Sequence, residues 1–264
     1  MKVSWNIRLQ NLIKAFGFTV MPFILSGCLV SLRTPSLRFL SPEAKGKAGH
    51  GEAFASLQST QRAVLIPETT DTPPTMNQPR NNKTEVLFGV NAAVGVWRLI
   101  DVYARLPNVF FENTPVVGGL KFQFIGAPES EEKMGNFSVS LIAGGGWAQD
   151  SDHDTAEVAP SSDAFHKVHT AVLESGLLAG YRVNENFLGY FGSFFTEYLS
   201  SGYVKQGTTK YNYDQSAHQI ASNLGIQINF AAFLARLELG MSSSRWNSRW
   251  AHDPLMGIAV GGRW

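Results

Sequence analysis

The sequence predicts an all-β fold: a closed, antiparallel transmembrane β-barrel of eight to ten strands, with ten preferred, preceded by a signal peptide and a linker. Three observations lead to this prediction. Apolar residues recur at every second position between Glu85 and Trp264, which is the pattern of strands and not of helices. The connections between these segments are alternately short and long. The chain is also thinly charged, with 16% charged and 12% aromatic residues.

Composition excludes several classes of protein. The net charge of the 264 residues is +1, and no basic run or nucleic-acid motif occurs, so no nucleic-acid partner is predicted. A single cysteine leaves no internal disulfide framework. No apolar run of about 18 residues follows residue 30, which argues against a helical membrane protein. A mean hydropathy of −0.06 leaves a soluble β-sandwich and a membrane β-barrel both open.

Residues 1–27 have the composition of a secretory signal peptide. A basic start precedes an apolar run of about 11 residues, which is too short to span a bilayer. The basic residues are Lys2, Arg8 and Lys14. The sequence Leu25-Ser26-Gly27-Cys28 resembles a bacterial lipobox. The resemblance implies that Cys28 becomes the lipidated first residue of the mature protein; the alternative is an ordinary signal peptide with an incidental cysteine.

The residues after Cys28 bear on localisation. Leu29, and not an aspartate, follows the cysteine, which by resemblance to other lipoproteins permits sorting to the outer membrane. We therefore expect a bacterial outer-membrane protein anchored through Cys28 in the periplasmic leaflet, with the lipoprotein-sorting machinery among its partners. Residues 28–48 contain Pro35 and Pro42 without sustained periodicity, and we interpret them as the lipidated N-terminus and a linker. The predicted barrel covers residues 49–264.

The two faces of the predicted strands distinguish a barrel from a sandwich. One face is continuous and apolar, whereas the other consists of small and polar residues with sparse charges. A soluble sandwich would expose a face rich in Lys, Glu and Thr, whereas a narrow barrel encloses a crowded polar lumen. In residues 233–241, for example, Leu237 and Leu239 oppose Arg236 and Glu238. This pattern favours the barrel.

Nine segments alternate clearly, and a tenth strand is expected at 49–66, where the alternation is weak. The nine segments are 85–95, 98–107, 116–126, 135–149, 166–183, 187–206, 213–229, 232–245 and 253–264. Short connections at 184–186 and 230–231 contrast with long polar loops such as 150–165. Outer-membrane barrels show this asymmetry, with the short turns on the periplasmic side. Eight strands, with two segments misinterpreted, is the alternative.

The chain ends in Gly-Ile-Ala-Val-Gly-Gly-Arg-Trp. A final amphipathic strand that closes on an aromatic residue, Trp264, resembles the signal by which the barrel-assembly machinery recognises its substrates. From about residue 50 the chain is similar to the broad family of small outer-membrane barrels typified by the transmembrane domains of outer-membrane proteins A and X. The resemblance implies that outer-membrane lipids and the barrel-assembly machinery are partners.

Charged residues on the polar face form the candidate site. They are Asp101, Arg105, Lys121, Glu174, Arg182, Glu197, Arg236, Glu238 and Arg263. A small barrel has an interior just wide enough to be filled by side chains. Opposite charges there should pair, because an isolated buried charge costs several kcal/mol. We predict an ion-pair plug; the alternative is a charge-lined water channel.

The sequence predicts no metal, no cofactor and no enzymatic activity. The acidic loop at 150–154 has alternating aspartates but lacks the remaining features of a calcium loop. His166 and His169 are three positions apart on a predicted strand and therefore face opposite sides. His218 and Ser222 share a lipid-facing strand face, yet four positions at ~3.3 Å each place them ~13 Å apart. That separation is too long for a nucleophile and its base.

The predicted function is a structural or surface-interaction role, with self-assembly as one form of it. Segments 166–183 and 187–206 are longer than the ~9–11 residues that a crossing strand needs, so their outer half should project from the membrane. The projecting part carries Tyr198, Tyr203, Tyr211 and Tyr213 beside Lys205 and Lys210. Tyrosine suits contact surfaces because its apolar ring ends in a polar group. A narrow porin-like channel is the main alternative, and a lipid-modifying enzyme is the third.

Overall fold

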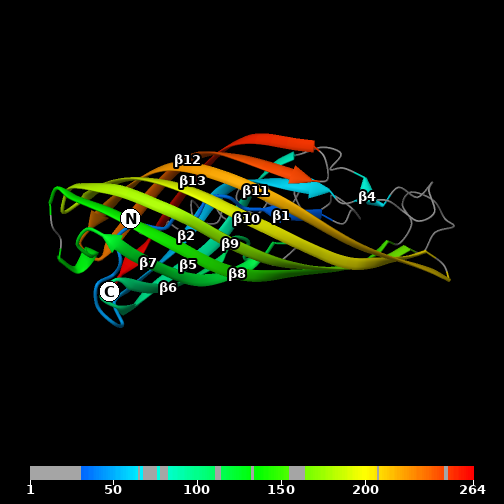
Figure 1. The fold of residues 1–264 in the computed structure, drawn as a ribbon, viewed down its shortest axis with the longest axis horizontal. Helices are drawn as coiled ribbons and strands as arrows, with labels where there is room; N and C mark the ends of the chain where they lie inside the picture. The colour runs from blue at the N-terminus through cyan, green and yellow to red at the C-terminus, as the bar shows by residue number, and fades with distance from the viewer. Residues whose placement is uncertain are drawn as a thin grey trace, which may run out of the picture.

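Ten antiparallel strands close into a barrel in the computed structural model (Figure 1), which describes residues 31–64, 66–67, 76–77, 83–110, 114–131, 134–154, 164–206, 208–246 and 249–264. The strands are β2 (Gly51–Val64), β5 (Lys83–Trp97), β6 (Ile100–Leu106), β7 (Val116–Ile125), β8 (Asn136–Asp154), β9 (Ala164–Asn184), β10 (Phe187–Gln206), β11 (Thr209–Phe230), β12 (Phe233–Trp246) and β13 (Arg249–Arg263). Each pairs with its neighbours along the chain, and β2 pairs with both β5 and β13, which closes the ring. The predicted fold class and the preferred number of ten strands are confirmed.

Three short strands and one 3-10 helix complete the described structure. Strand β1 (Ser31–Thr34) pairs with the last residues of β2. Strands β3 (Ile66–Pro67) and β4 (Met76–Asn77) pair with each other in the connection between β2 and β5. The 3-10 helix η2 (Glu129–Glu131) lies between β7 and β8. No helix in the described part of the chain is long and apolar enough to cross a membrane.

The barrel has two different ends. At one end, which we call the turn end, the strands are joined by the tight turns at 98–99, 185–186 and 231–232 and by the connection that carries η2. The first residue of β2 and the C-terminal residue also meet there, with two hydrogen bonds of 3.0 Å between the backbones of Gly51 and Trp264. We call the opposite end the loop end. In Figure 1 the turn end is at the left, beside the C-terminus.

Polarity is inverted relative to a soluble protein. The outer face exposes large apolar side chains, among them Val86, Phe88 and Val90 on β5, Leu120 and Phe122 on β7, Leu237, Leu239 and Met241 on β12, and Met256, Ile258 and Val260 on β13. The side chains that alternate with them point inward and are mostly polar or charged. A closed sheet leaves no unpaired edge, which is what spanning a bilayer with strands requires. The outer face is therefore a lipid-compatible surface around a polar lumen.

The strands differ in height around the barrel. β8, β9, β10 and β11 contain 19, 21, 20 and 22 residues, whereas β6 and β7 contain 7 and 10. Figure 1 shows the long strands extending past the others at the loop end. The residues 150–154, which we expected in a loop, belong to β8. Strand pairing therefore continues well beyond the segments that the alternation defined.

For residues 34–45 the structure corrects our interpretation of a linker between the lipid and the barrel, and residues 28–30 lie outside the described residues. Every residue from Thr34 to Lys45 is buried, and the contacts of this stretch are with inward-facing side chains of the barrel wall. We call residues 34–45 the lumen segment. Its sequence lacks periodicity because wall residues surround it on all sides, so no face of it is selected to be apolar.

The lumen segment runs from the loop end to the turn end. Strand β1 is antiparallel to β2, with Ser31 opposite Val64 and Thr34 opposite Gln61, so it lies beside the loop end of β2. After Lys45 the chain reaches the turn end, where the backbone of Gly49 donates a 3.0 Å hydrogen bond to Gly95. The chain then reverses and enters the wall as β2. The first described residues therefore pass through the barrel before they build it.

Candidate functional site

Seven of the nine charged residues that the sequence placed in the lumen do lie there, buried on the inner face: Asp101, Arg105, Lys121, Glu174, Arg182, Arg236 and Glu238. Their partners were not foreseen, since most of their contacts are with the lumen segment or with two glutamates near the turn end.

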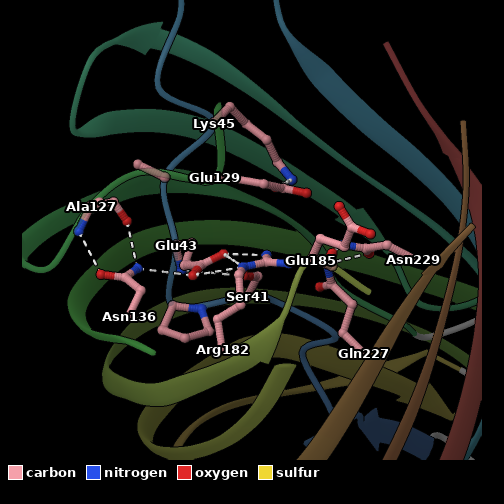
Figure 2. A network of polar contacts seen from close by, with 12 residues as sticks. Ser41, Glu43, Lys45, Ala127, Glu129, Asn136, Arg182, Glu185, Gln227 and Asn229 are labelled. Atoms are coloured by element: carbon pink, nitrogen blue, oxygen red, sulfur yellow. Dashed lines mark hydrogen bonds and ion pairs between the residues drawn. The ribbon is translucent and has the colours of Figure 1, made fainter. Parts of the chain in front are cut away.

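Lys45 is the centre of a cluster at the turn end. Its ammonium lies 2.5 Å from a carboxylate oxygen of Glu52 on β2 and 2.6 Å from one of Glu129 in η2. Arg236 on β12 ion-pairs with the same oxygen of Glu52 at 2.7 Å, and Arg263 lies 3.3 Å from Glu129. Figure 2 shows Lys45 and Glu129 meeting above the rest of the network.

Electrostatics at Glu129 follow from this cluster. Burial alone would raise the pKa of the Glu129 carboxyl group, but the Lys45 ammonium attracts it and donates a hydrogen bond to it. The guanidinium groups of Arg236 and Arg182 act in the same direction, and together these cations lower the pKa to about 2. Glu129 is therefore an anion at neutral pH despite its burial.

Glu43 forms the second contact of the lumen segment. Arg182 of β9 donates to both of its carboxylate oxygens, with Nε at 3.0 and 2.9 Å, and a second guanidinium nitrogen also contacts Glu43. Asn136 of β8 donates a further hydrogen bond of 3.0 Å. This two-pronged pairing, visible in Figure 2, is the geometry in which a guanidinium and a carboxylate interact most strongly.

Backbone groups of the lumen segment also find partners on the wall. The Lys121 ammonium donates to the carbonyl oxygens of Ser41 at 2.9 Å and Glu43 at 2.6 Å, and it ion-pairs with Asp101 at 2.9 Å. Asp101 in turn accepts the backbone N–H of Lys45 at 3.0 Å. An extended segment has no internal backbone hydrogen bonds, so these wall side chains supply what a sheet would otherwise supply.

Arg38 occupies the middle of the lumen. It ion-pairs with Glu174 of β9 at 3.1 Å, and Arg105 of β6 reaches the same carboxylate oxygen at 2.5 Å. Its terminal nitrogens donate to Pro35 and to Thr196 of β10, each at 2.7 Å. Glu174 is therefore the shared ion-pair partner of one cation from the lumen segment and one from the wall.

Glu238 makes no ion pair within the described residues, although we expected opposite charges in the lumen to pair. It accepts hydrogen bonds from Tyr190 at 2.8 Å, from Asn223 at 2.6 Å and from the backbone of Arg38 at 3.2 Å. Arg236 ion-pairs with Glu52 across the seam and donates a 2.8 Å hydrogen bond to Gln227. Glu238 thus binds a backbone N–H of the lumen segment and not one of its charged side chains.

Near the loop end the contacts become neutral. Gln219 of β11 donates to the carbonyl oxygen of Thr34 at 3.2 Å and to Ser242 of β12 at 3.0 Å. Thr170 and Ser200 share a 2.9 Å hydrogen bond between β9 and β10. No ion pair of the lumen segment is found this far toward the loop end within the described residues.

Apolar residues of the lumen segment pack where the wall has no side chain. A Cβ added at Gly257 of β13 would lie 2.6 Å from Phe39 and 2.8 Å from Leu37, and one at Gly180 of β9 would lie 2.7 Å from Pro42. Phe39 also packs edge-on against Phe54 of β2, with ring centroids 6.3 Å apart. The two glycines therefore leave the space that the lumen segment fills.

Two predicted lumen residues lie elsewhere. Glu197 is half-buried on the outer face of β10, 3.8 Å from His218, because the alternation of β10 points its neighbours Thr196 and Tyr198 inward. Arg263 lies at the rim of the turn end, where it contacts Glu129 and the carbonyl oxygen of Ala231. Glu197 had been assigned to the lumen because it is charged, whereas its strand position faces outward.

Sequence reasoning missed five charged residues of the site: Arg38, Glu43, Lys45, Glu52 and Glu129. The first three were assigned to a linker, Glu52 to a weakly alternating strand and Glu129 to a turn. One signal was available, since Arg38, Glu43 and Lys45 lie among apolar and proline residues in a chain that has few charges. Together the described lumen holds six buried cations and six buried anions: Arg38, Lys45, Arg105, Lys121, Arg182 and Arg236 with Glu43, Glu52, Asp101, Glu129, Glu174 and Glu238.

Other candidate residues have separate positions. Cys28 lies outside the described residues. His218 and Ser222 are both on the outer face of β11. Another pair on the outer face, Ser243 and His252, is joined by a 2.8 Å hydrogen bond. Asp253 interacts electrostatically with His252, but no hydrogen bond from a carboxylate to the His252 ring is found in the described chain. The described residues contain no group of three metal-binding side chains.

Comparison with known proteins gives distant structural matches alone. No family model and no curated protein matches the sequence. Among solved structures, the chain is similar to Ail, the attachment invasion locus protein of Yersinia pestis, at 11% identity and a TM-score of 0.34 over 83% of this chain and 100% of Ail. Ail in complex with the heparin analogue sucrose octasulfate matches at 10% identity and a TM-score of 0.37 over the same shares. Scores of this size carry no argument about function.

Proposed function

We propose that this chain is an outer-membrane β-barrel lipoprotein, similar in class to the small barrels of outer-membrane proteins A and X, with a structural or surface-interaction role and a lumen closed by its own N-terminal segment. The observation that carries the proposal is the content of the lumen. A pore needs a free path with charges available to solutes. Here the six cations of the lumen each meet a carboxylate within the protein.

The apolar outer face supports the location in a membrane, and the lipobox-like residues support processing at Cys28. The turn end would then face the periplasm, since short turns lie on that side in outer-membrane barrels. Trp264 lies at this end, as expected for the residue that the barrel-assembly machinery would recognise. The loop end, with the long hairpins, would face the outside.

Planar-bilayer recording tests closure of the lumen. We expect little steady conductance from the intact protein. A variant that lacks residues 29–46 and joins Cys28 to Lys47 should conduct, because the lumen segment is gone and its wall partners are hydrated. Reproducible large steps from the intact protein would overturn closure and favour the porin-like alternative.

The long hairpins support the surface-interaction part of the proposal. At the loop end of β10 and β11, Lys210 lies over the ring of Tyr203, 4.1 Å from its centroid. Tyr198, which we expected on this projecting surface, is instead buried in the barrel and donates a 3.1 Å hydrogen bond to Gln219. The proposed contact surface therefore begins beyond Tyr198.

Native mass spectrometry from mild detergent tests self-association through this hairpin. Oligomers that disappear when residues 199–213 are replaced by a tight turn would support it. A monomer that is unchanged by the replacement would contradict self-association. Contact with a foreign surface would then be tested by comparing how well intact cells that express each form bind to that surface.

A further inference from the structure

We propose that the N-terminus of the mature chain leaves the barrel at the loop end, so that the lipid on Cys28 enters the external leaflet and not the periplasmic leaflet. The inference rests on the lipidation included in the proposed function. It is carried by the direction of the lumen segment, by the position of β1 and by the length of chain between Cys28 and Ser31.

The position of β1 fixes where the described chain begins. Its four residues pair with Gln61 to Val64, the last residues of β2. On the neighbouring strand β5, Val86 is level with Ser59 and is the last large apolar residue on the outer face, and Thr84 follows it, level with Gln61. Strand β1 therefore lies at the loop-end boundary of the apolar outer face.

The seam between the first and last barrel strands provides the exit. β13 and β2 pair over seven residues, from Arg263 opposite Glu52 to Gly257 opposite Gln58. Their contact ends at Ser59, whose hydroxyl accepts a 2.8 Å hydrogen bond from the Met256 backbone. Beyond this point β13 pairs with β12 alone in the described structure, and β1 occupies the edge of β2. The chain thus reaches the wall at the place where β2 and β13 are no longer paired.

Two contacts hold β1 in this position. Arg33 ion-pairs with Glu85 of β5 at 2.8 Å, across the width of β2, and both side chains are partly shielded. Leu32 is 3% exposed and belongs to the buried apolar cluster that includes Val168 and Ala217. A strand that is hydrogen-bonded, ion-paired and packed is a fixed part of the barrel.

The length of chain before β1 excludes the periplasmic leaflet. Three positions separate Cys28 from Ser31, and they span at most about 11 Å when fully extended. β2 has 14 residues, which at about 3.3 Å each is about 45 Å along a tilted strand. Cys28 therefore cannot reach the turn end while β1 is paired. The filled lumen offers no second path. The proposal therefore replaces the periplasmic leaflet that we expected from the sequence with the external leaflet.

Tag accessibility on intact cells tests the inference. A short hydrophilic epitope is inserted between Leu29 and Val30, and matched control proteins carry it after Thr208, in the loop-end turn, or after Glu185, in the turn-end turn. We expect the N-terminal tag to bind antibody on intact cells as the Thr208 control does. An N-terminal tag that becomes accessible only after permeabilisation, like the Glu185 control, would overturn the inference. If both controls are protected, the outer-membrane location itself fails.

A cross-link supplies a second readout in case the insertion prevents folding. In a Cys28→Ala background, Leu32→Cys and Ala63→Cys place two thiols on register partners of β1 and β2. We expect a disulfide in the folded barrel, and its absence in folded protein would overturn the position of β1. Mass spectrometry of the wild type gives the remaining arm. An acylated Cys28 together with an externally accessible tag supports a lipid in the external leaflet. An unmodified Cys28 thiol would overturn the lipidation, and the accessibility of the tag would then decide only where the chain leaves the barrel.

Discussion

The two halves of the lumen hold the same segment by different physical means. Toward the turn end, Lys45 and Glu43 make ion pairs in which both partners are buried. Toward the loop end, Thr34 is held by a neutral hydrogen bond from Gln219, and β1 is held by strand pairing and by the partly exposed ion pair between Arg33 and Glu85. Breaking a buried ion pair strands a charge, whereas losing a neutral hydrogen bond costs far less. The turn end should therefore dominate retention of the lumen segment.

The largest effect is expected from Arg182→Ala. It leaves Glu43 buried without its guanidinium partner, and removal of one member of a buried pair costs about 3–5 kcal/mol. Urea unfolding in detergent micelles or vesicles would measure this loss, and Glu43→Ala in the same protein should restore part of it. If Arg182→Ala costs no more than Gln219→Ala, the contrast between the two halves is wrong.

Acid should weaken the turn end selectively. The pKa of Glu129 is lowered to about 2, below the ordinary value of ~4.3 for a glutamate. A lowered pKa in the folded state contributes stability above the ordinary value, and this stability is lost as the pH falls from ~4.3 toward ~2. We expect the free energy of unfolding to fall between pH 5 and pH 2 and to fall less in Glu129→Gln. Equal slopes in the two proteins would contradict the role of Glu129.

A smaller effect is expected at the loop end. Gln219→Ala removes three hydrogen bonds between uncharged groups, to Thr34, Ser242 and Tyr198. Each should contribute about 1 kcal/mol, and the bond to Thr34 is the one that holds the lumen segment. Thr170→Ala is the matched control, because its hydrogen bond to Ser200 joins two wall strands and does not involve the lumen segment. Both can be measured by the same urea unfolding. A loss in Gln219→Ala as large as that in Arg182→Ala would place the main attachment at the wrong end.

The smallest effect is expected outside the lumen, at Ser243 on the outer face. Because no hydrogen bond from a carboxylate to His252 is found in the described structure, we expect Ser243→Ala to leave the lipid composition of the host unchanged. Mass spectrometry of lipopolysaccharide and phospholipids, with and without expression of each form, would measure it. A deacylated lipid that depends on Ser243 would contradict the non-enzymatic role and support the third function considered from the sequence.

The sequence predicted the barrel wall well and its content poorly. Period-two alternation identifies a strand when its two sides meet different solvents, as Leu237 and Glu238 do, so the ten strands and most wall charges could be located. The lumen segment meets protein on every side, so Arg38, Glu43 and Lys45 follow no period. Their partners are also distant in sequence: 139 positions separate Arg182 from Glu43. Such pairings depend on which strands face one another across the closed barrel, and a local sequence pattern does not predict that arrangement.

The filled lumen constrains the order in which this barrel can form. Nine buried charged side chains of the wall and η2 surround the lumen segment, and a segment threaded through a ring that had already closed would have to pass them one by one. The strands must therefore wrap around residues 34–45 while the seam is still apart, and the seven pairs between β13 and β2 form last. In this view the closing strands form around the segment: its charged side chains ion-pair with β2 and β9, and side chains of β6, β7 and β12 bind its backbone groups.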